Sequence, residues 1–135
     1  MIESAAEFRA LRLSDDLSEQ RRASHEEAPL EVWLAVIREE PDLRLWVAQN
    51  KTVPFEVLAL LARDSDPRVR FMVASKRKLT VELQLLIATD PDPSVVAALA
   101  HNRSLEASVR EVLSRHNDVL VRKALQANPL RPRPS

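Results

Sequence analysis

The sequence repeats itself at a fixed interval of 26 residues. Residues 54–79 and 80–105 align without a gap, so that Asp66-Pro67 recurs as Asp92-Pro93. The same interval relates Val69 to Val95 and Val121, Val73 to Leu99 and Leu125, Asp66 to Asp92 and Asp118, and Asn50 to Lys76, Asn102 and Asn128. A fixed period of this length indicates supersecondary units that stack, because a single unit cannot bury its own apolar face.

Each unit contains two short apolar patterns with helical spacing. In residues 54–79, the first pattern places Val57, Leu60 and Leu61 at i, i+3 and i+4, and the second repeats this spacing at Val69, Met72 and Val73. A strand would alternate with a period of two instead. The sequence therefore predicts an all-α solenoid of about five two-helix units.

The predicted solenoid is one domain covering residues 1–128. Residues 1–28 form a degenerate N-terminal capping unit, with residues 18–25 as its polar second helix, and four further units follow at 29–53, 54–79, 80–105 and 106–128. The first and last units are more polar, as terminal units in contact with water should be. The proline-rich segment 129–135 cannot continue a helix, so an extended or disordered tail is predicted there.

The turns between helices carry residues with capping chemistry. Asp66, Asp92 and Asp118 precede the second helix of their units, where a carboxylate accepts from the first free N–H groups. After the second helix comes the column of Asn50, Asn102 and Asn128, which Lys76 interrupts. Because the chain contains no glycine and asparagine tolerates positive φ best among the other residues, we expect a left-handed helix cap in this column.

Composition excludes several classes of function. The 20 basic and 20 acidic side chains cancel, so no overall charge attracts DNA or an anionic membrane. The lack of glycine excludes glycine-rich phosphate loops, and the lack of cysteine excludes disulfides, thiolate metal sites and cysteine nucleophiles. His25, His101 and His116 lack metal-ligand spacing. We therefore expect no cofactor, no metal and no catalytic residue.

Localisation is also an expectation from the sequence. No stretch of 18 apolar residues occurs, and the first residues include acidic side chains where a secretion signal would be basic and then apolar. The prediction is a cytoplasmic protein without a membrane segment.

The repeated unit resembles the leucine-rich repeat variant family of bacteria, a relative in shape of HEAT repeats. The pattern that carries the resemblance is P-x-E-V-L-x-x-L-A-x-D-x-D-P-x-V-R-x-x-V-A-x-N, which residues 54–74 match and which recurs in the copy ending at Asn102. The resemblance implies a right-handed superhelix of longer and shorter helices, the shorter sometimes 3₁₀, and protein interaction more often than catalysis. Some members hold a cysteine-ligated iron–sulfur cluster, which this chain cannot carry because it has no cysteine.

Two groups of residues are candidates for a partner-binding surface. The first is a basic ridge in the loops after the second helices, made of Lys51, Lys76, Arg77, Lys78 and Arg103. The second lies on those helices, where Arg44 and Arg70 form one column and Leu45 and Phe71 another. The alternative interpretations remain open: the ridge is a solvated loop edge, and Leu45 and Phe71 are core residues.

The predicted function is a non-catalytic scaffold that binds another macromolecule, first of all a protein. One alternative is a nucleic-acid-binding protein that resembles the HEAT-like DNA glycosylases, which would need a basic channel with aromatic platforms. Another is a self-associating building block, because residues 1–28 carry four basic and seven acidic side chains, net −3, whereas residues 103–135 carry seven and three, net +4.

Overall fold

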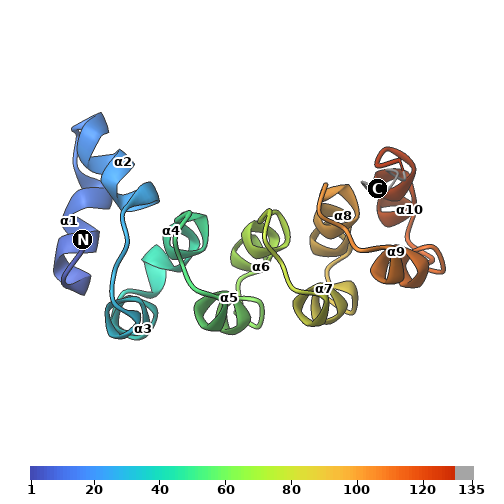
Figure 1. The fold of residues 1–135 in the computed structure, drawn as a ribbon, viewed down its shortest axis with the longest axis horizontal. Helices are drawn as coiled ribbons and strands as arrows, with labels where there is room; N and C mark the ends of the chain where they lie inside the picture. The colour runs from blue at the N-terminus through green and yellow to red at the C-terminus, as the bar shows by residue number, and fades with distance from the viewer. Residues whose placement is uncertain (130–135) are drawn as a thin grey trace, which may run out of the picture. The chain divides into compact units, whose positions relative to one another are not determined.

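The chain is entirely helical over the residues that the structure, a computed structural model, describes. These are residues 1–129, which form ten α-helices, one 3₁₀ helix and no strand (Figure 1). The all-α prediction is confirmed. The predicted tail lies outside the described residues apart from Pro129. None of the helices within residues 1–129 is long and apolar enough to cross a membrane.

The chain divides into two compact units, Met1–Ser65 and Asp66–Ser135. Unit 1 contains, in order, α1 (Ala5–Leu13), α2 (Leu17–His25), α3 (Leu30–Glu39), η1 (Pro41–Leu43), α4 (Arg44–Gln49) and α5 (Phe55–Leu61). Unit 2 contains α6 (Pro67–Ala74), α7 (Val81–Ala88), α8 (Pro93–His101), α9 (Ala107–Leu113) and α10 (Val119–Gln126). The predicted second helices are thus α-helical, and only α4 begins with a 3₁₀ turn.

In unit 1, α1 packs on α2 and α3, α2 packs on α4, and α3 packs on α4 and α5. The core centres on Phe8 and Trp33, whose rings meet edge to face with centroids 5.4 Å apart. Both side chains are fully buried. The predicted stripe of α5 needs one correction: Leu60 is exposed, and Leu58 is buried with Val57 and Leu61. The buried arc of this short helix is centred on Leu61, and Leu60 lies about 100° away from it.

In unit 2, α6, α8 and α10 lie side by side in one layer, while α7 and α9 form the other (Figure 1). The residues that repeat at the 26-residue interval on the first layer are all buried, namely Val69 and Val73, Val95 and Leu99, and Val121 and Leu125. Leu83 and Ile87 of α7 and Val109 and Leu113 of α9 complete the core. These apolar positions of the sequence pattern are therefore core positions in this unit.

The predicted aspartate caps are confirmed. The carboxylates of Asp66, Asp92 and Asp118 accept from the backbone N–H two residues later, at 2.9, 2.9 and 2.8 Å, and begin α6, α8 and α10. Hydrogen bonds from Arg68 to Asp66, and from Ser94 to Asp92, hold the pKa of each carboxyl below its ordinary value. Ionised caps suit helix N-termini, where the peptide dipoles leave a partial positive charge.

The prediction of left-handed asparagine caps is wrong. No residue between 1 and 129 has positive φ, and Asn50 and Asn102 lie at φ −58° and −66°. Each of the three asparagines instead donates from Nδ2 to two backbone carbonyls at the end of a helix about 26 residues earlier in the chain. The acceptors are Ala23 and Glu26 for Asn50 (2.8 and 3.1 Å), Ala74 and Lys76 for Asn102 (2.9 and 2.7 Å), and Ala100 and Asn102 for Asn128 (both 2.8 Å).

The reason for the asparagines is therefore their side-chain amide and not their backbone. The last carbonyls of a helix have no hydrogen-bond partner within the helix. A carbonyl that is buried without a donor lowers the stability of the fold. The Nδ2 group of asparagine supplies that donor, while its Oδ1 accepts from the following loop, as Asn102 does from Ser104 N at 2.8 Å. Glycine, the usual residue at helix ends, has no side chain that could do this.

Candidate partner-binding surface

Two of the predicted surface arginines belong to ion pairs inside their own units. Arg70 of α6 contacts Asp90 twice, with Nε–Oδ2 at 2.8 Å and Nη2–Oδ1 at 3.2 Å. In unit 1, Arg44 lies 3.4 Å from Asp64 and donates from Nε to the carbonyl of Ile37 at 2.7 Å. Both aspartates are nearly buried. These arginines connect one helix pair to the next, so they contribute little to an open surface.

The same position in the next helix pair uses different chemistry. Val96 stands 26 residues after Arg70 and is fully buried, and His116 stands 26 residues after Asp90. The backbone N–H of Asp118 donates to Nδ1 of His116 at 3.1 Å, as that of Asp92 does to Asp90 Oδ1 at 2.9 Å. Arginine and aspartate are thus replaced together, and His116 keeps the hydrogen bond within the turn. This supports a structural role for the Arg70–Asp90 pair and for His116.

The apolar candidates differ in their exposure. Phe71 on α6 is 45% exposed, so it is a surface residue, whereas Leu45 on α4 is half-buried. The hydroxyl of Ser75 donates to the carbonyl of Phe71 at 3.0 Å, one helical turn away. Residues four apart lie on one face of a helix, so Phe71 and Ser75 share the same side of α6.

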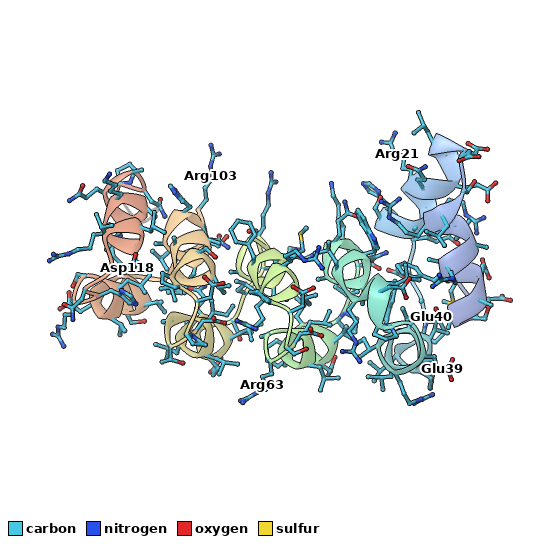
Figure 2. The ribbon with its side chains drawn as sticks, turned by 180° about the vertical axis from the view of Figure 1, so that it is seen from behind. Arg21, Glu39, Glu40, Arg63, Arg103 and Asp118 are labelled. Carbon is cyan, nitrogen blue, oxygen red and sulfur yellow. The ribbon has the colours of Figure 1, made fainter. Side chains whose placement is uncertain are left out.

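A cavity of about 450 Å³ opens beside Ser75 in unit 2. It is formed where α6 and α8 end and by the loops that follow them. Its lining residues are Ser75, Arg77, Ala98, His101, Asn102, Arg103 and Ser104. Figure 2 shows Arg103 extending from the end of α8, away from the α7 layer. The predicted ridge residues Arg77 and Arg103 therefore lie at one cavity.

Hydrogen bonds hold the two loops together at this cavity. Asn102 donates to the carbonyls of Ala74 and Lys76, and Ser104 donates from its hydroxyl to the carbonyl of Arg77. The backbone on both sides of Arg77 is thereby connected to the loop that carries Arg103. The backbones that carry Arg77 and Arg103, two residues that line this cavity, are thus connected before any ligand binds.

The charges at this cavity are not compensated by acidic side chains. Among residues 1–129, no carboxylate lies within ion-pair distance of Arg77, Lys78 or Arg103. Lys76 differs, because its side chain is half-buried and its carbonyl accepts from Asn102. Lys51, the remaining ridge residue, is exposed in unit 1, where its backbone N–H donates to Ser24 at 2.9 Å.

A hydrolytic triad of Ser24, His25 and Asp16 is not assembled. The Ser24 hydroxyl does contact Nδ1 of His25 at 2.8 Å, but Asp16 caps the opposite end of α2. The helix between them has nine residues and is thus about 13 Å long. No group of three or more potential metal ligands occurs within residues 1–129.

A second cavity, in unit 1, is lined by residues for which the sequence predicted no role in binding. It measures about 270 Å³ and is lined by Arg12, Leu17, Gln20, Arg21, Ser24, Trp46 and Gln49. One signal was present in the sequence: Trp46 and Gln49 occupy the same positions in their unit as Ala98 and His101 do two units later.

Comparisons with known proteins identify no relative. Neither a protein-family model, nor a curated protein, nor a solved structure matches the chain. The function of the two cavities is therefore inferred from the residues that line them.

Proposed function

We propose that the chain is a non-catalytic binding module of the cytoplasm, built as a right-handed α-solenoid of 26-residue units like the leucine-rich repeat variant proteins. Its ligand is an acidic segment of another protein, which binds where α6 and α8 end. The recurring asparagine bonds, aspartate caps and buried valine positions support the 26-residue unit. The surface of unit 2 supports the choice of ligand.

The observation that carries this proposal is the pair Arg77 and Arg103 at one cavity, without acidic neighbours and with their loops already connected. Phe71 adds an exposed aromatic ring on the same side of α6 as Ser75, which lines that cavity. The few residues that dominate the binding energy of protein interfaces are enriched in arginine, tryptophan and tyrosine. An acidic partner follows from charge complementarity, which speeds association and excludes basic partners.

Pre-organisation favours binding at this surface. Ordering a loop and its side chains on association costs free energy, at about 0.5–1.5 kcal/mol for each immobilised long side chain. The bonds from Asn102 and Ser104 fix the loop backbones beforehand, so this cost is limited to the arginine side chains. The module would then act by presenting a fixed arrangement of charge and aromatic surface.

The test is a capture experiment with the full-length protein immobilised. The double variant Arg77→Gln/Arg103→Gln and the single variant Phe71→Ser should each lose most of the proteins that the wild type retains. The matched control Arg115→Gln/Arg122→Gln removes two exposed charges elsewhere in the same unit and should retain them. Equal capture by all four proteins would overturn the choice of surface.

Two further outcomes separate the alternatives. Capture that nuclease treatment abolishes would favour a nucleic-acid ligand, for which the binding would also weaken steeply with salt. Recovery of a second copy of this chain in place of another protein would favour a self-associating building block. Turnover of a small molecule by the purified protein would contradict the non-catalytic part of the proposal.

A further inference from the structure

We propose that unit 1 carries a second, separate binding site, in which Arg12, lying on the ring of Trp46, and Arg21 hold a carboxylate side chain of a peptide. The site is the 270 Å³ cavity between the end of α1, α2 and α4. Small-molecule pockets usually begin at about 300 Å³. This cavity therefore suits one or two side chains of an extended segment better than a cofactor.

The stacked pair of Arg12 and Trp46 defines the site. The guanidinium carbon of Arg12 lies 3.4 Å from the centre of the Trp46 ring, so the cation is held against the aromatic face. Nε of Arg12 is buried and has no hydrogen-bond partner in the part of the chain that the structure describes. The two terminal nitrogens of Arg12 also make no hydrogen bond within the described residues. Unlike Nε, they are accessible to solvent.

The lack of an anionic partner distinguishes Arg12 and Arg21 from other arginines of unit 1. Within the described residues, Arg9, Arg22, Arg38 and Arg44 each have a carboxylate within 3.4 Å. Arg12, Arg21 and Arg63 have none. Figure 2 shows Arg21 and Arg63 on opposite sides of the unit. Arg12 and Arg21 thus line one cavity and have no anionic partner among the described residues.

Two other polar side chains of the cavity, Gln20 and Ser24, already donate hydrogen bonds within the chain. Gln20 donates from Nε2 to the carbonyl of Ser14 at 2.6 Å, and the Ser24 hydroxyl donates to the carbonyl of Arg21 at 3.0 Å. The two arginines therefore supply the donors for a ligand, and arginine donors in a planar fork match a carboxylate in two-point contact.

The acidic residues nearby do not occupy this role. Asp16 accepts from Ser18 at the start of α2, and Glu26 accepts from Arg22 at 2.7 Å. Neither carboxylate has an ion pair with Arg12 or Arg21 in residues 1–129. Arg12 and Arg21 therefore keep their charge available for a carboxylate from another molecule.

The apolar border of the cavity narrows the class of ligand further. Leu17 lines the cavity and is 78% exposed, so most of its apolar side chain is accessible to a ligand. The indole edge of Trp46, which is half-buried, adds to it. The ligand that fits is a peptide in which an acidic residue lies next to an apolar one. Inorganic phosphate would meet the charge but not the apolar border.

Trp46 is a built-in reporter for binding. Trp33, the other tryptophan, is fully buried against Phe8, so a ligand-dependent change in tryptophan emission reports on Trp46. The full-length protein is titrated with a capped octapeptide of alternating glutamate and leucine, with its glutamine–leucine counterpart, and with inorganic phosphate. We expect a saturable change with the first probe alone.

Variants then assign the site. Arg12→Gln and Arg21→Gln should each weaken binding of the acidic peptide about tenfold, which corresponds to losing one charge-assisted hydrogen bond. Arg38→Gln is the matched control and should bind like the wild type. Arg38 is an exposed arginine of the same unit, and among residues 1–129 it forms an ion pair only with its neighbour Glu39. Arg21 is exposed, so its substitution tests the site even if replacing Arg12 disturbs the fold.

The proposal is overturned if the acidic peptide causes no saturable change, if phosphate or the glutamine peptide binds equally well, or if Arg12→Gln and Arg21→Gln bind like the wild type. Loss of peptide binding in Arg77→Gln/Arg103→Gln would overturn it too, because the peptide would then lie in unit 2. An unchanged affinity in that variant supports a separate site in unit 1, whatever the outcome of the capture experiment.

Discussion

Arg70 and Asp90 face each other in a two-point ion pair, with contacts of 2.8 and 3.2 Å, and are only 14% and 5% exposed. A buried carboxylate loses its hydration, so its charged form is stabilised mainly by the partner cation. In this unit the pair connects the helix α6 to the turn that precedes α8, where Asp90 also accepts from Asp92 N. This pair explains why Arg70, which the sequence placed in a candidate surface column, belongs to the packed interior of unit 2.

We predict that Asp90→Ala lowers the free energy of unfolding by about 3 kcal/mol. The reason is that the nearly buried cation of Arg70 loses the carboxylate of Asp90. Urea unfolding measures the loss. Glu111→Ala is the control, since it breaks the exposed pair with Arg115 and should cost less than about 1 kcal/mol. The double variant Arg70→Val/Asp90→His, which copies Val96 and His116, should be more stable than Asp90→Ala. Equal losses at Asp90 and Glu111 would contradict the role assigned to the pair.

Substitutions at Asn102 show whether this residue stabilises the fold through its side chain or through its backbone conformation. If the residue served as a left-handed cap, Asn102→Gly would stabilise the protein, because glycine adopts positive φ without a steric penalty. The observed φ of −66° and the two bonds to Ala74 and Lys76 predict the opposite, a loss of about 2 kcal/mol for either Gly or Ala at this position. Thermal and urea unfolding of the two variants side by side provide the measurement, and a gain in stability with glycine would refute the side-chain role.

The core of unit 1 depends on the edge-to-face pair of Phe8 and Trp33. Phe8→Ala should cost about 4 kcal/mol, because it removes a fully buried ring and leaves a cavity next to the indole. The emission of Trp33 should also shift to longer wavelength as water reaches it. Phe55→Ala is the control, since Phe55 is 47% exposed and its ring should be dispensable for stability. A loss below about 1 kcal/mol at Phe8 would show that the ring is not part of the packed core.

The stability of the protein should fall in acid because of Glu26. Hydrogen bonds from Arg22, and next the hydrogen bond from the terminal amine, lower the pKa of Glu26 from 4.5 to about 2. A carboxyl with a lowered folded-state pKa stabilises the fold above the unfolded value and loses this contribution as the pH falls through the folded value. The contribution of Glu26 is therefore full above pH 4.5 and declines towards pH 2. Unfolding at a series of pH values should give a shallower decline for Glu26→Gln, and parallel curves for both proteins would contradict the assignment.

Local chemistry determined much of what could be predicted. The helices and the caps at Asp66, Asp92 and Asp118 follow from spacing and from side chains that act within two or three residues, so a linear pattern is sufficient to find them. The sequence predicted a ridge of Lys51, Lys76, Arg77, Lys78 and Arg103, of which Arg77 and Arg103 line one cavity; a role of the ridge in binding stays a prediction. The exposure of Phe71 remained open, since a helical wheel does not say which faces a neighbouring helix covers.

What the sequence by itself determined is therefore an all-helical chain with aspartate caps at the start of α6, α8 and α10. Only the tertiary structure decided the partners of Asn102, the pairing of Arg70 with Asp90 and the stacking of Arg12 on Trp46. The physical reason is distance along the chain. Each of these contacts joins residues 20 or more positions apart, so the partner of a polar side chain depends on how the helices pack and not on its neighbours in the sequence.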